Sequence, residues 1–348
     1  MSFLNYIVSE QVITQVVSGF PFWGLLVLMA VCLAVLSKGA DWMIDGAVAL
    51  AQGTGLPRII IGATIISLGT TMPEAFVSVL AAWTGNPGLA LGNGVGSIIC
   101  DTGLIFGVMC LISRVPVRRF ILNRTGWVQV GSATILVLFA HLSLYISPGA
   151  PTIGRGVGVL FLLALGVYLY FSYRWAKQSG LPSDAEFEHQ WGPGKSVLFI
   201  FMGLVGVVAG SRVLIPVAAE GALRLGVPQD IIAATLVAFG TSLPELVTAI
   251  SAVKKGHPQI MVGNVVGADV LNCLFVLGAA SIARPLEIPP NFFYYHFPAM
   301  LLILYSFRVF IFINTDGWFK RWQGGFLLSL YAIYIVLQYS FSIAATHS

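Results

Sequence analysis

Long apolar segments recur along this chain and are separated by short polar stretches. Ten can be drawn, each near or above the roughly 20 residues that an α-helix needs to cross a bilayer. Residues 1–20 form a candidate interfacial helix ahead of them. The pattern predicts an all-α membrane protein with about ten transmembrane helices. Their approximate bounds are 22–50, 58–83, 88–112, 123–147, 153–175, 195–225, 228–253, 259–283, 293–314 and 322–343.

The one long polar stretch, residues 176–194, divides the predicted spans into two sets of five. We therefore expect a first half at 1–175, a linker at 176–194 and a second half at 195–348. Because five is odd, the second half enters the membrane from the opposite side. Such inverted-topology repeats are typical of secondary transporters that work by alternating access.

The two halves share a motif, and the predicted α-repeats occupy about 56–112 and 227–283. They align without a gap at an offset of 171 residues, and 17 of the first 52 aligned positions are identical. Each contains Gly-Thr-[Ser/Thr]-x-Pro-Glu followed by Gly-Asn-x-Val-Gly. Each therefore places one glutamate, Glu74 or Glu245, inside a span, where a carboxylate is costly and indicates function.

Composition agrees with this pattern and excludes several classes of protein. The chain is 57% hydrophobic and 9% charged, whereas soluble proteins carry about 25% charged residues. The four cysteines have no Cys-x-x-Cys spacing, so a reduced structural role is expected. The phosphate-binding Gly-x-x-x-x-Gly-Lys-[Ser/Thr] and the metalloprotease His-Glu-x-x-His motifs are absent. We expect no enzyme, no organic cofactor and no nucleic-acid partner, but transport driven by an ion gradient.

Basic residues predict the orientation in the membrane. Loops after odd-numbered spans, with their flanks, contain 12 Lys and Arg residues, and loops after even-numbered spans contain 2. Basic loops stay in the cytoplasm. The linker is therefore expected there, and both termini outside the cytoplasm.

Proline positions predict breaks in spans two and seven beside the glutamates. Pro73 has no amide hydrogen, so span two should open over Ser67 to Thr71 and free backbone carbonyls. Pro244 predicts the same in span seven. Unwound backbone persists in a membrane only where a cation, water or protein group satisfies it. The oxygen donors around the two breaks are Thr70, Thr71, Glu74, Thr241, Ser242, Glu245 and the carbonyl near Ala238.

Spans three and eight supply the other wall of the predicted site, and the motif glycines allow them to approach closely. An all-oxygen site suits a hard cation such as calcium, and no Cys or His lies beside the motif glutamates to suit a softer metal. Ser97 could instead bond another helix, and Asp269 could cap span eight. The polar residues on this wall are Ser97, Asp101, Asp269 and Asn272.

The paired motifs resemble the α-repeats of the cation/calcium exchanger superfamily, in particular its prokaryotic sodium–calcium exchanger branch. The resemblance covers the ten-span plan, including Gly39-Ala40-Asp41-Trp42 in span one. It implies that Glu74 and Glu245 hold calcium together with the carbonyls of Thr70 and Thr241. It also implies flanking sodium sites, built from Thr71, Ser242, Ser97 and the carbonyls of Ser67 and Ala238.

The chain departs from the family pattern at two places. A frequent pattern has Asn in the first repeat and Asp in the second, where this chain has Asp101 and Asn272. Ala268 replaces a usual Ser, so one sodium site loses a hydroxyl. These departures leave calcium binding expected and the sodium stoichiometry open.

The resemblance implies an antiporter that exchanges sodium for calcium across a prokaryotic inner (plasma) membrane. A proton–calcium antiporter is the first alternative, although the hydroxyls beside the glutamates favour sodium. A cation channel is a remoter alternative, because channels build filters from rings of repeated subunits. In span one, Lys38, Asp41 and Asp45 are expected to form a local ion pair or a gating contact.

Overall fold

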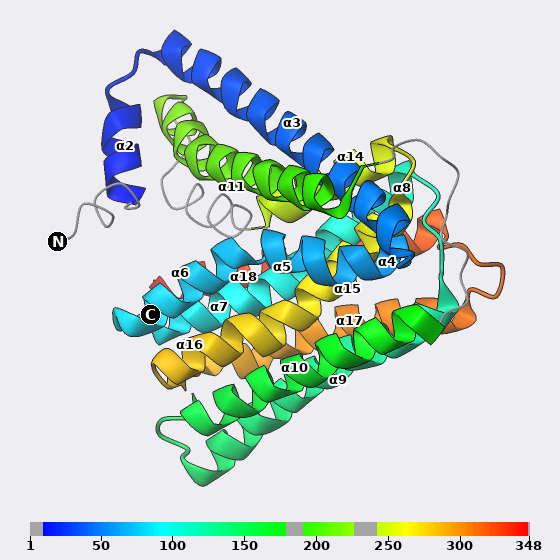
Figure 1. The fold of residues 1–348 in the computed structure, drawn as a ribbon. Helices are drawn as coiled ribbons and strands as arrows, with labels where there is room; N and C mark the ends of the chain where they lie inside the picture. The colour runs from blue at the N-terminus through cyan, green and yellow to red at the C-terminus, as the bar shows by residue number, and fades with distance from the viewer. Residues whose placement is uncertain (1–9, 179–190, 226–241, 347–348) are drawn as a thin grey trace.

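The computed structural model describes residues 10–178, 191–225 and 242–346, and these are almost entirely helical (Figure 1). In the first half the elements are α2 (Glu10–Ser18), α3 (Phe22–Thr54), α4 (Arg58–Ile61), η1 (Gly62–Ile66), α5 (Ser67–Thr70), α6 (Met72–Trp83), α7 (Pro87–Ile99), η2 (Cys100–Phe106), α8 (Gly107–Ile112), α9 (Arg119–Ile146), β1 (Thr152–Ile153) and α10 (Arg155–Gln178). In the second half they are α11 (Pro193–Arg224), α14 (Leu243–Lys254), α15 (Pro258–Leu271), η4 (Asn272–Val276), α16 (Leu277–Ala283), β2 (Leu286–Glu287), η5 (Phe292–His296), α17 (Phe297–Ile313) and α18 (Arg321–Thr346).

The predicted spans correspond closely to these helices. Among the described residues, seven helices are long and apolar enough to cross a membrane, or eight when the bent pair in span two counts as one. The first half of span seven, residues 226–241, lies outside the described residues. Helix α10 continues to Gln178 and α11 begins at Pro193, so helix occupies both ends of the stretch predicted as a linker.

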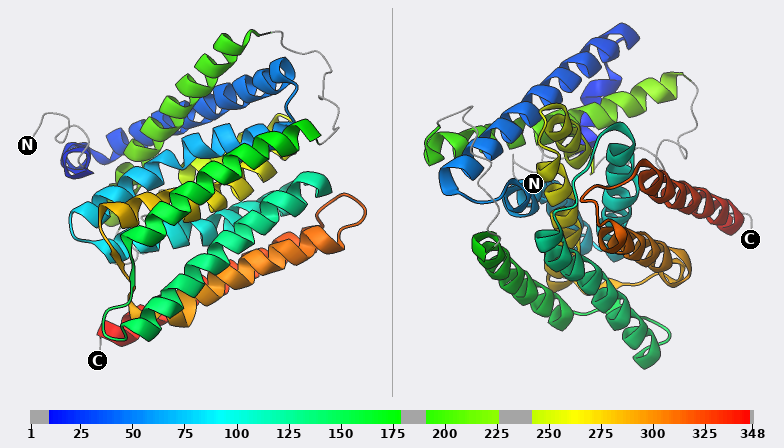
Figure 2. Two further views of the ribbon diagram at one scale, coloured as in Figure 1. Left: turned by 60° about the horizontal axis from the view of Figure 1, so that its bottom comes forward. Right: turned by 90° about the vertical axis from the view of Figure 1, so that its right-hand side faces the viewer.

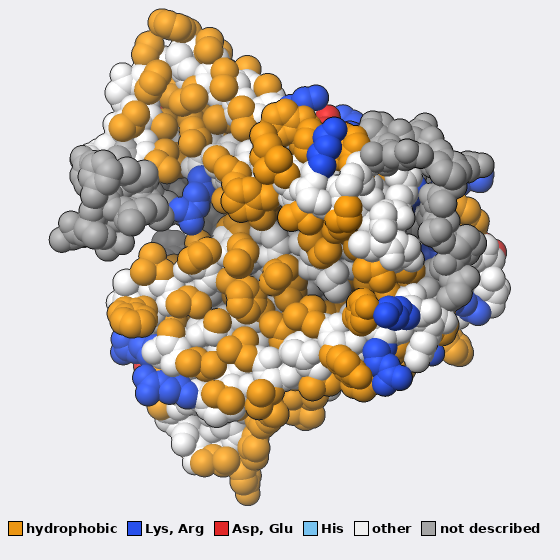
Figure 3. Space-filling view, viewed as in Figure 1, with side chains coloured by type: hydrophobic (Ala, Val, Ile, Leu, Met, Phe, Trp, Pro, Cys, Tyr) orange, Lys and Arg blue, Asp and Glu red, His pale blue; other side chains and the backbone are white. Residues whose placement is uncertain are grey.

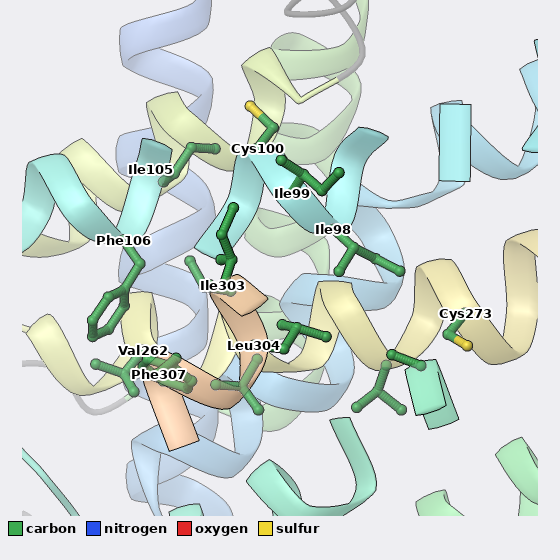
Figure 4. Close-up of a cluster of buried hydrophobic side chains, with 14 of the residues drawn as sticks. Ile98, Ile99, Cys100, Ile105, Phe106, Val262, Cys273, Ile303, Leu304 and Phe307 are labelled. Carbon is green, nitrogen blue, oxygen red and sulfur yellow. The ribbon is translucent and has the colours of Figure 1, made fainter. Parts of the chain in front are cut away.

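Spans three and eight form the centre of the bundle. Every residue of α15 from Ile260 to Leu271 is buried, as is most of α7. The central spans also contact the outer helices through aromatic rings. The Phe106 ring in span three meets the Phe307 ring of α17 edge-on, at 4.7 Å between centroids (Figure 4). The core therefore lies where the repeat motifs lie.

Helices α3 and α11 form a pair along one side of the bundle (Figures 1 and 2), and Met43, Ile44 and Ile200 of this pair belong to the main hydrophobic core. The two helices touch through glycine, because a Cβ on Gly203 would meet the Gly39 carbonyl oxygen at 2.5 Å. Polar contacts join the pair to α14. Ser251 Oγ donates to Asp41 Oδ1 at 2.7 Å, and Lys255 Nζ pairs with Asp45 Oδ1 at 2.5 Å. The expected ion pair within span one is therefore wrong: Asp45 pairs with a lysine from another helix.

Short backbone pairings tie the loops together at both ends of the bundle. Strands β1 and β2 are antiparallel and join the loop after span four to the loop after span eight. A bridge between Pro116 and Trp318 joins the loop after span three to the loop after span nine. Spans three and four correspond to eight and nine, so the two pairings are related by the inverted repeat.

The outer surface is that of a membrane protein. Hydrophobic side chains cover most of the face in Figure 3, and Lys and Arg side chains gather mainly on its right-hand side. The large exposed apolar side chains include Trp23, Leu138, Leu163, Phe201 and Phe312. Such a surface suits a lipid environment, because water would not stabilise it.

Motif glycines bring span eight into backbone contact with span two. A Cβ on Gly263 would overlap the carbonyl oxygen of Ile59, and one on Gly267 would lie 2.5 Å from that of Ala63. The matching glycines of the first repeat are less closely packed by the described residues. The nearest described atom to a Cβ on Gly92 is 3.9 Å away, and none lies within 4 Å of one on Gly96. The predicted close approach is confirmed for the second repeat.

We expect Gly263→Ala to destabilise the protein, because its methyl group must displace the backbone of span two. Overpacking of this kind costs about 1–3 kcal/mol. The measurement is the midpoint of thermal unfolding in detergent, which should fall. Gly166→Ala is the matched control, because Gly166 is exposed on α10 and no described atom lies within 4 Å of the position its methyl group would take. Equal midpoints for both variants would contradict the contact.

Candidate cation site

Span two breaks immediately before its glutamate, as predicted. Helix α5 ends at Thr70 and α6 begins at Met72, and the two parts of the span are bent by 42°. The opening is narrower than expected, because Ser67–Thr70 remains helical and the Ser67 carbonyl still accepts the Thr71 amide at 2.9 Å. Pro73 lies in the first turn of α6, where a missing amide hydrogen costs least. Glu74 lies in the same turn.

Span seven repeats this arrangement in its described part. Helix α14 begins at Leu243, and Pro244 and Glu245 lie in its first turn. Ser242 directly precedes the helix and is buried. Thr241 and Ala238 lie outside the described residues, so their roles stay predictions. In both spans a glutamate thus occupies the amino-terminal turn of a half-helix, whose dipole favours negative charge.

Three carboxyl groups are buried here without hydrogen-bond partners. Glu74, Asp101 and Glu245 are at most 1% exposed, and none of their six carboxyl oxygens has a partner among the described residues. An uncompensated buried charge costs several kcal/mol. Unsatisfied buried polar groups in a native fold call for a specific explanation, such as a bound ion. Other unpartnered polar atoms belong to Thr71, Ser97, Ser242 and Asn272.

The two repeats contribute to one site. Thr70 and Thr71 of span two lie beside the Glu245 carboxyl of span seven, and Ser242 lies beside that of Asp101. Glu74 is close enough to interact electrostatically with Asp101, and Glu245 with Glu74. No ion pair between these carboxyl groups and a basic side chain forms in the described part of the chain. Within the described residues, their charge is therefore not offset by a basic side chain.

π-Helical turns mark the matching positions in spans three and eight. Asp101 is the second residue of η2, and Asn272 is the first residue of η4. Such turns interrupt the regular i→i−4 bonding and occur frequently at functional sites. Their positions match through the repeat offset, although the sequence pattern did not predict them. The structure therefore brings Asp101 to the glutamates, as expected, and places Asn272 at the equivalent position in span eight.

The motif asparagines have a role that sequence reasoning missed. Asn93 Nδ2 donates to the Glu74 carbonyl oxygen at 3.2 Å and to Ser78 Oγ at 2.9 Å. In the other repeat, Thr70 Oγ1 donates to Asn264 Oδ1 at 3.3 Å. These asparagines hold spans three and eight against the broken helix. The Gly-Asn pair in each repeat could have indicated this role, but our sequence interpretation considered only its glycines.

Asp269 differs from the other predicted ligands. Its Oδ2 atom accepts hydrogen bonds from Thr102 Oγ1 and Gln129 Nε2, each at 2.5 Å. It lies inside α15, which continues directly into η4, so the alternative that it caps span eight is wrong. Oxygen atoms predominate around the glutamates, which fits a hard cation. The expectation that no Cys lies beside them is wrong, because the Cys100 thiol lies beside Ser242 and close enough to Glu245 to interact electrostatically. Among the described residues, no three His, Cys, Asp or Glu side chains are gathered closely enough to hold a metal ion, so the carboxyl groups do not form a preassembled metal cage in this structure.

Known proteins share both the sequence and the fold. The family model for sodium/calcium exchanger proteins matches residues 24–174 and 195–340. The sodium/calcium exchanger MaX1 of Methanosarcina acetivorans is 28% identical, over 88% of this chain and 95% of its own. The inner membrane protein YrbG of Escherichia coli is 31% identical, over 81% and 87%.

The solved structures agree with these matches. The sodium-calcium exchanger NCX_Mj, soaked with 10 mM Na⁺ and no Ca²⁺, superposes with a TM-score of 0.75 at 26% identity, over 90% of this chain and 98% of its own. The paired motifs, the ten-span plan and the shared fold therefore lead to one conclusion. This chain is an integral membrane protein that belongs to the sodium/calcium exchanger family.

Proposed function

We propose that this protein is a secondary-active antiporter that exchanges sodium for calcium by alternating access. The observation that carries the proposal is the burial of Glu74, Asp101 and Glu245 with six unpartnered carboxyl oxygens. A divalent cation offsets two of these charges and takes six to eight oxygen ligands in irregular geometry. Coupled exchange requires that such a site be open to only one side of the membrane at a time.

Each predicted ligand except Asp269 has a role in this proposal. Glu74 and Glu245 supply charge to calcium. Neutral oxygens complete its shell and form the sodium sites beside it. Asp101 and Asn272 lie between the repeats, where the charge of Asp101 adds to the attraction for cations. The neutral donors are the carbonyls of Ser67, Thr70, Ala238 and Thr241 and the hydroxyls of Thr71, Ser97 and Ser242.

Sodium is the favoured coupling ion. The buried hydroxyls of Thr71 and Ser242 are neutral oxygen donors that a proton carrier would not need. The relative MaX1 and the structure NCX_Mj are both named sodium–calcium exchangers. A proton–calcium antiporter would use the same glutamates as proton carriers, and transport measurements separate the two.

An asymmetry between the repeats supports alternating access. Leu243 and Val247 of α14 pack against the cluster formed by α3 and α11. Their repeat counterparts on α6, Met72 and Phe76, are 38% and 66% exposed. The α3–α11 pair thus covers these positions in the second repeat but not their counterparts in the first, although Leu204 of α11 also packs against Gly69 of span two. Exchange of the two docking positions would open the site to the opposite side of the membrane.

Calcium uptake into proteoliposomes tests this function. Uptake should follow an outward sodium gradient and saturate with external calcium, and a pH gradient alone should not drive it. Uptake driven only by the pH gradient would favour the proton–calcium alternative. Uptake without any counter-ion, and without saturation, would indicate a channel.

We expect Glu74→Gln or Glu245→Gln to abolish measurable exchange while the protein stays folded. Each glutamate supplies a formal charge to a desolvated divalent ion, and loss of such a charge costs about 2–5 kcal/mol, or at least about 30-fold in affinity. The measurements are sodium-driven calcium uptake and thermal unfolding. Glu287→Gln removes an exposed carboxylate from β2 and should leave uptake unchanged. Near-normal uptake by the double glutamate variant would contradict the site.

We also propose an orientation and an organisation of the chain. The linker around 176–194 lies in the cytoplasm, between a first half at 1–175 and a second half at 195–348. Both termini lie outside the cytoplasm, and the membrane is a prokaryotic plasma membrane. The 12-to-2 distribution of basic residues between the two sets of loops supports this orientation.

Cysteine labelling tests the orientation. All four native cysteines are buried, so the wild-type protein provides a low background. Ala150→Cys, in the exposed loop after span four, should react with a membrane-impermeant maleimide from outside the cell. Thr315→Cys, in the exposed loop after span nine, should react only after the membrane is opened. The reverse pattern would invert the proposed topology.

A further inference from the structure

A buried polar cluster joins three spans beside the cation site. The cluster consists of Asp269 on α15, Thr102 on η2 and Gln129 on α9, all at most 2% exposed. Asp269 Oδ2 accepts both hydrogen bonds, from Thr102 Oγ1 and Gln129 Nε2, and Gln129 Nε2 also lies 3.3 Å from Thr102 Oγ1. This cluster fixes η2 against the centre of the bundle.

The other repeat has no equivalent of this cluster. At the 171-residue offset, the three positions correspond to Ile98, Cys273 and Met300. These residues are also buried, and all three belong to the large hydrophobic core; Ile98 and Cys273 are shown in Figure 4. This fold can therefore accommodate apolar side chains at the three positions. The polar cluster accompanies the half in which the site carries a carboxyl group, Asp101, rather than the amide of Asn272.

Thr102 connects the cluster to the site. It directly follows Asp101 in η2, a turn that lacks the regular helical bonding which would otherwise hold Asp101 in place. The carboxyl groups of Asp101 and Asp269 are also close enough to interact electrostatically. Groups that orient a metal ligand typically change metal affinity about 10–100-fold when they are mutated.

We propose that Asp269 is a positioning residue of the cation site: through Thr102 it fixes the π-helical turn that presents Asp101 to the transported ions. The proposal rests on the proposed function and assigns to Asp269 a role other than that of a direct ligand. It acts on cation affinity rather than on the conformational step. Its acceptor oxygen, and not its charge, is the property that this role requires.

The first test compares two substitutions at Asp269 by sodium-driven calcium uptake into proteoliposomes. Asp269→Leu removes the acceptor and should raise the half-saturating sodium concentration about 10-fold, with the maximal rate retained. Asp269→Asn keeps an oxygen acceptor for both donors and should restore most of the affinity. Equal impairment of both variants would show that the charge itself is required and would overturn the proposal. So would wild-type affinity in Asp269→Leu.

A double-mutant cycle tests whether the effect passes through Asp101. In an Asp101→Asn background, Asp269→Leu should add little further loss of sodium affinity, because residues that act as one unit are not additive. Full additivity of the two losses would overturn the proposed link. Wild-type protein that shows no sodium-driven uptake would instead refute the proposed function. Calcium binding by the same variants is then compared through the shift that calcium produces in their thermal unfolding temperature.

A triple variant guards against a simple folding defect. Asp269→Ile, Thr102→Cys and Gln129→Met together install the residues of the other repeat. The triple variant removes all the polar groups at once, so none is left buried and unpaired. We expect a melting temperature near that of wild type and a sodium affinity still reduced about 10-fold. Wild-type affinity in this folded variant would overturn the proposal.

Discussion

The structure depends on the burial of four carboxyl groups, those of Glu74, Asp101, Glu245 and Asp269, that no basic side chain of the described chain neutralises. Inside a membrane this arrangement is stable only when protons or cations enter with the carboxyl groups. Glu74 and Glu245 sit at the start of half-helices, so the backbone offers partial positive charge but not a full counter-charge. The fold therefore requires protons or cations to offset these carboxyl groups. In the proposed antiporter, this requirement is the physical basis of ion coupling.

Much of the architecture could be predicted from the sequence, because its signals are local or repeated. Apolar length located the spans, Pro73 located the break in span two, and the repeat offset paired Glu74 with Glu245. The hydrogen bonds between distant helices could not be predicted in this way. Asn93, Gln129 and Thr102 are ordinary polar residues in sequence, and only the packing of spans two, three, four and eight shows which groups they meet.

Two sequence expectations failed for different physical reasons. The opening of span two is narrow because the Thr71 amide still finds the Ser67 carbonyl, so proline alone does not unwind a whole turn. π-Helical turns, none of which contains a proline, loosen the helices of spans two, three and eight at Gly62–Ile66, Cys100–Phe106 and Asn272–Val276. Asp45 pairs across helices with Lys255 rather than within span one. At Asp45 a tertiary contact overrode a rule based on spacing, whereas in span two a local backbone hydrogen bond kept the helix closed.

The backbone contact between Gly263 and Ile59 has a mechanical consequence. Spans two and eight meet without intervening side chains, so they cannot slide or separate without breaking a close-packed seam. The walls of the site thus behave as one rigid block, while α3 and α11 are joined to α14 in part by bonds that exchange readily with water, at Asp41, Asp45 and Lys255. Under the proposed alternating-access mechanism, the bound ion stays nearly in place and the α3–α11 pair is the part that moves.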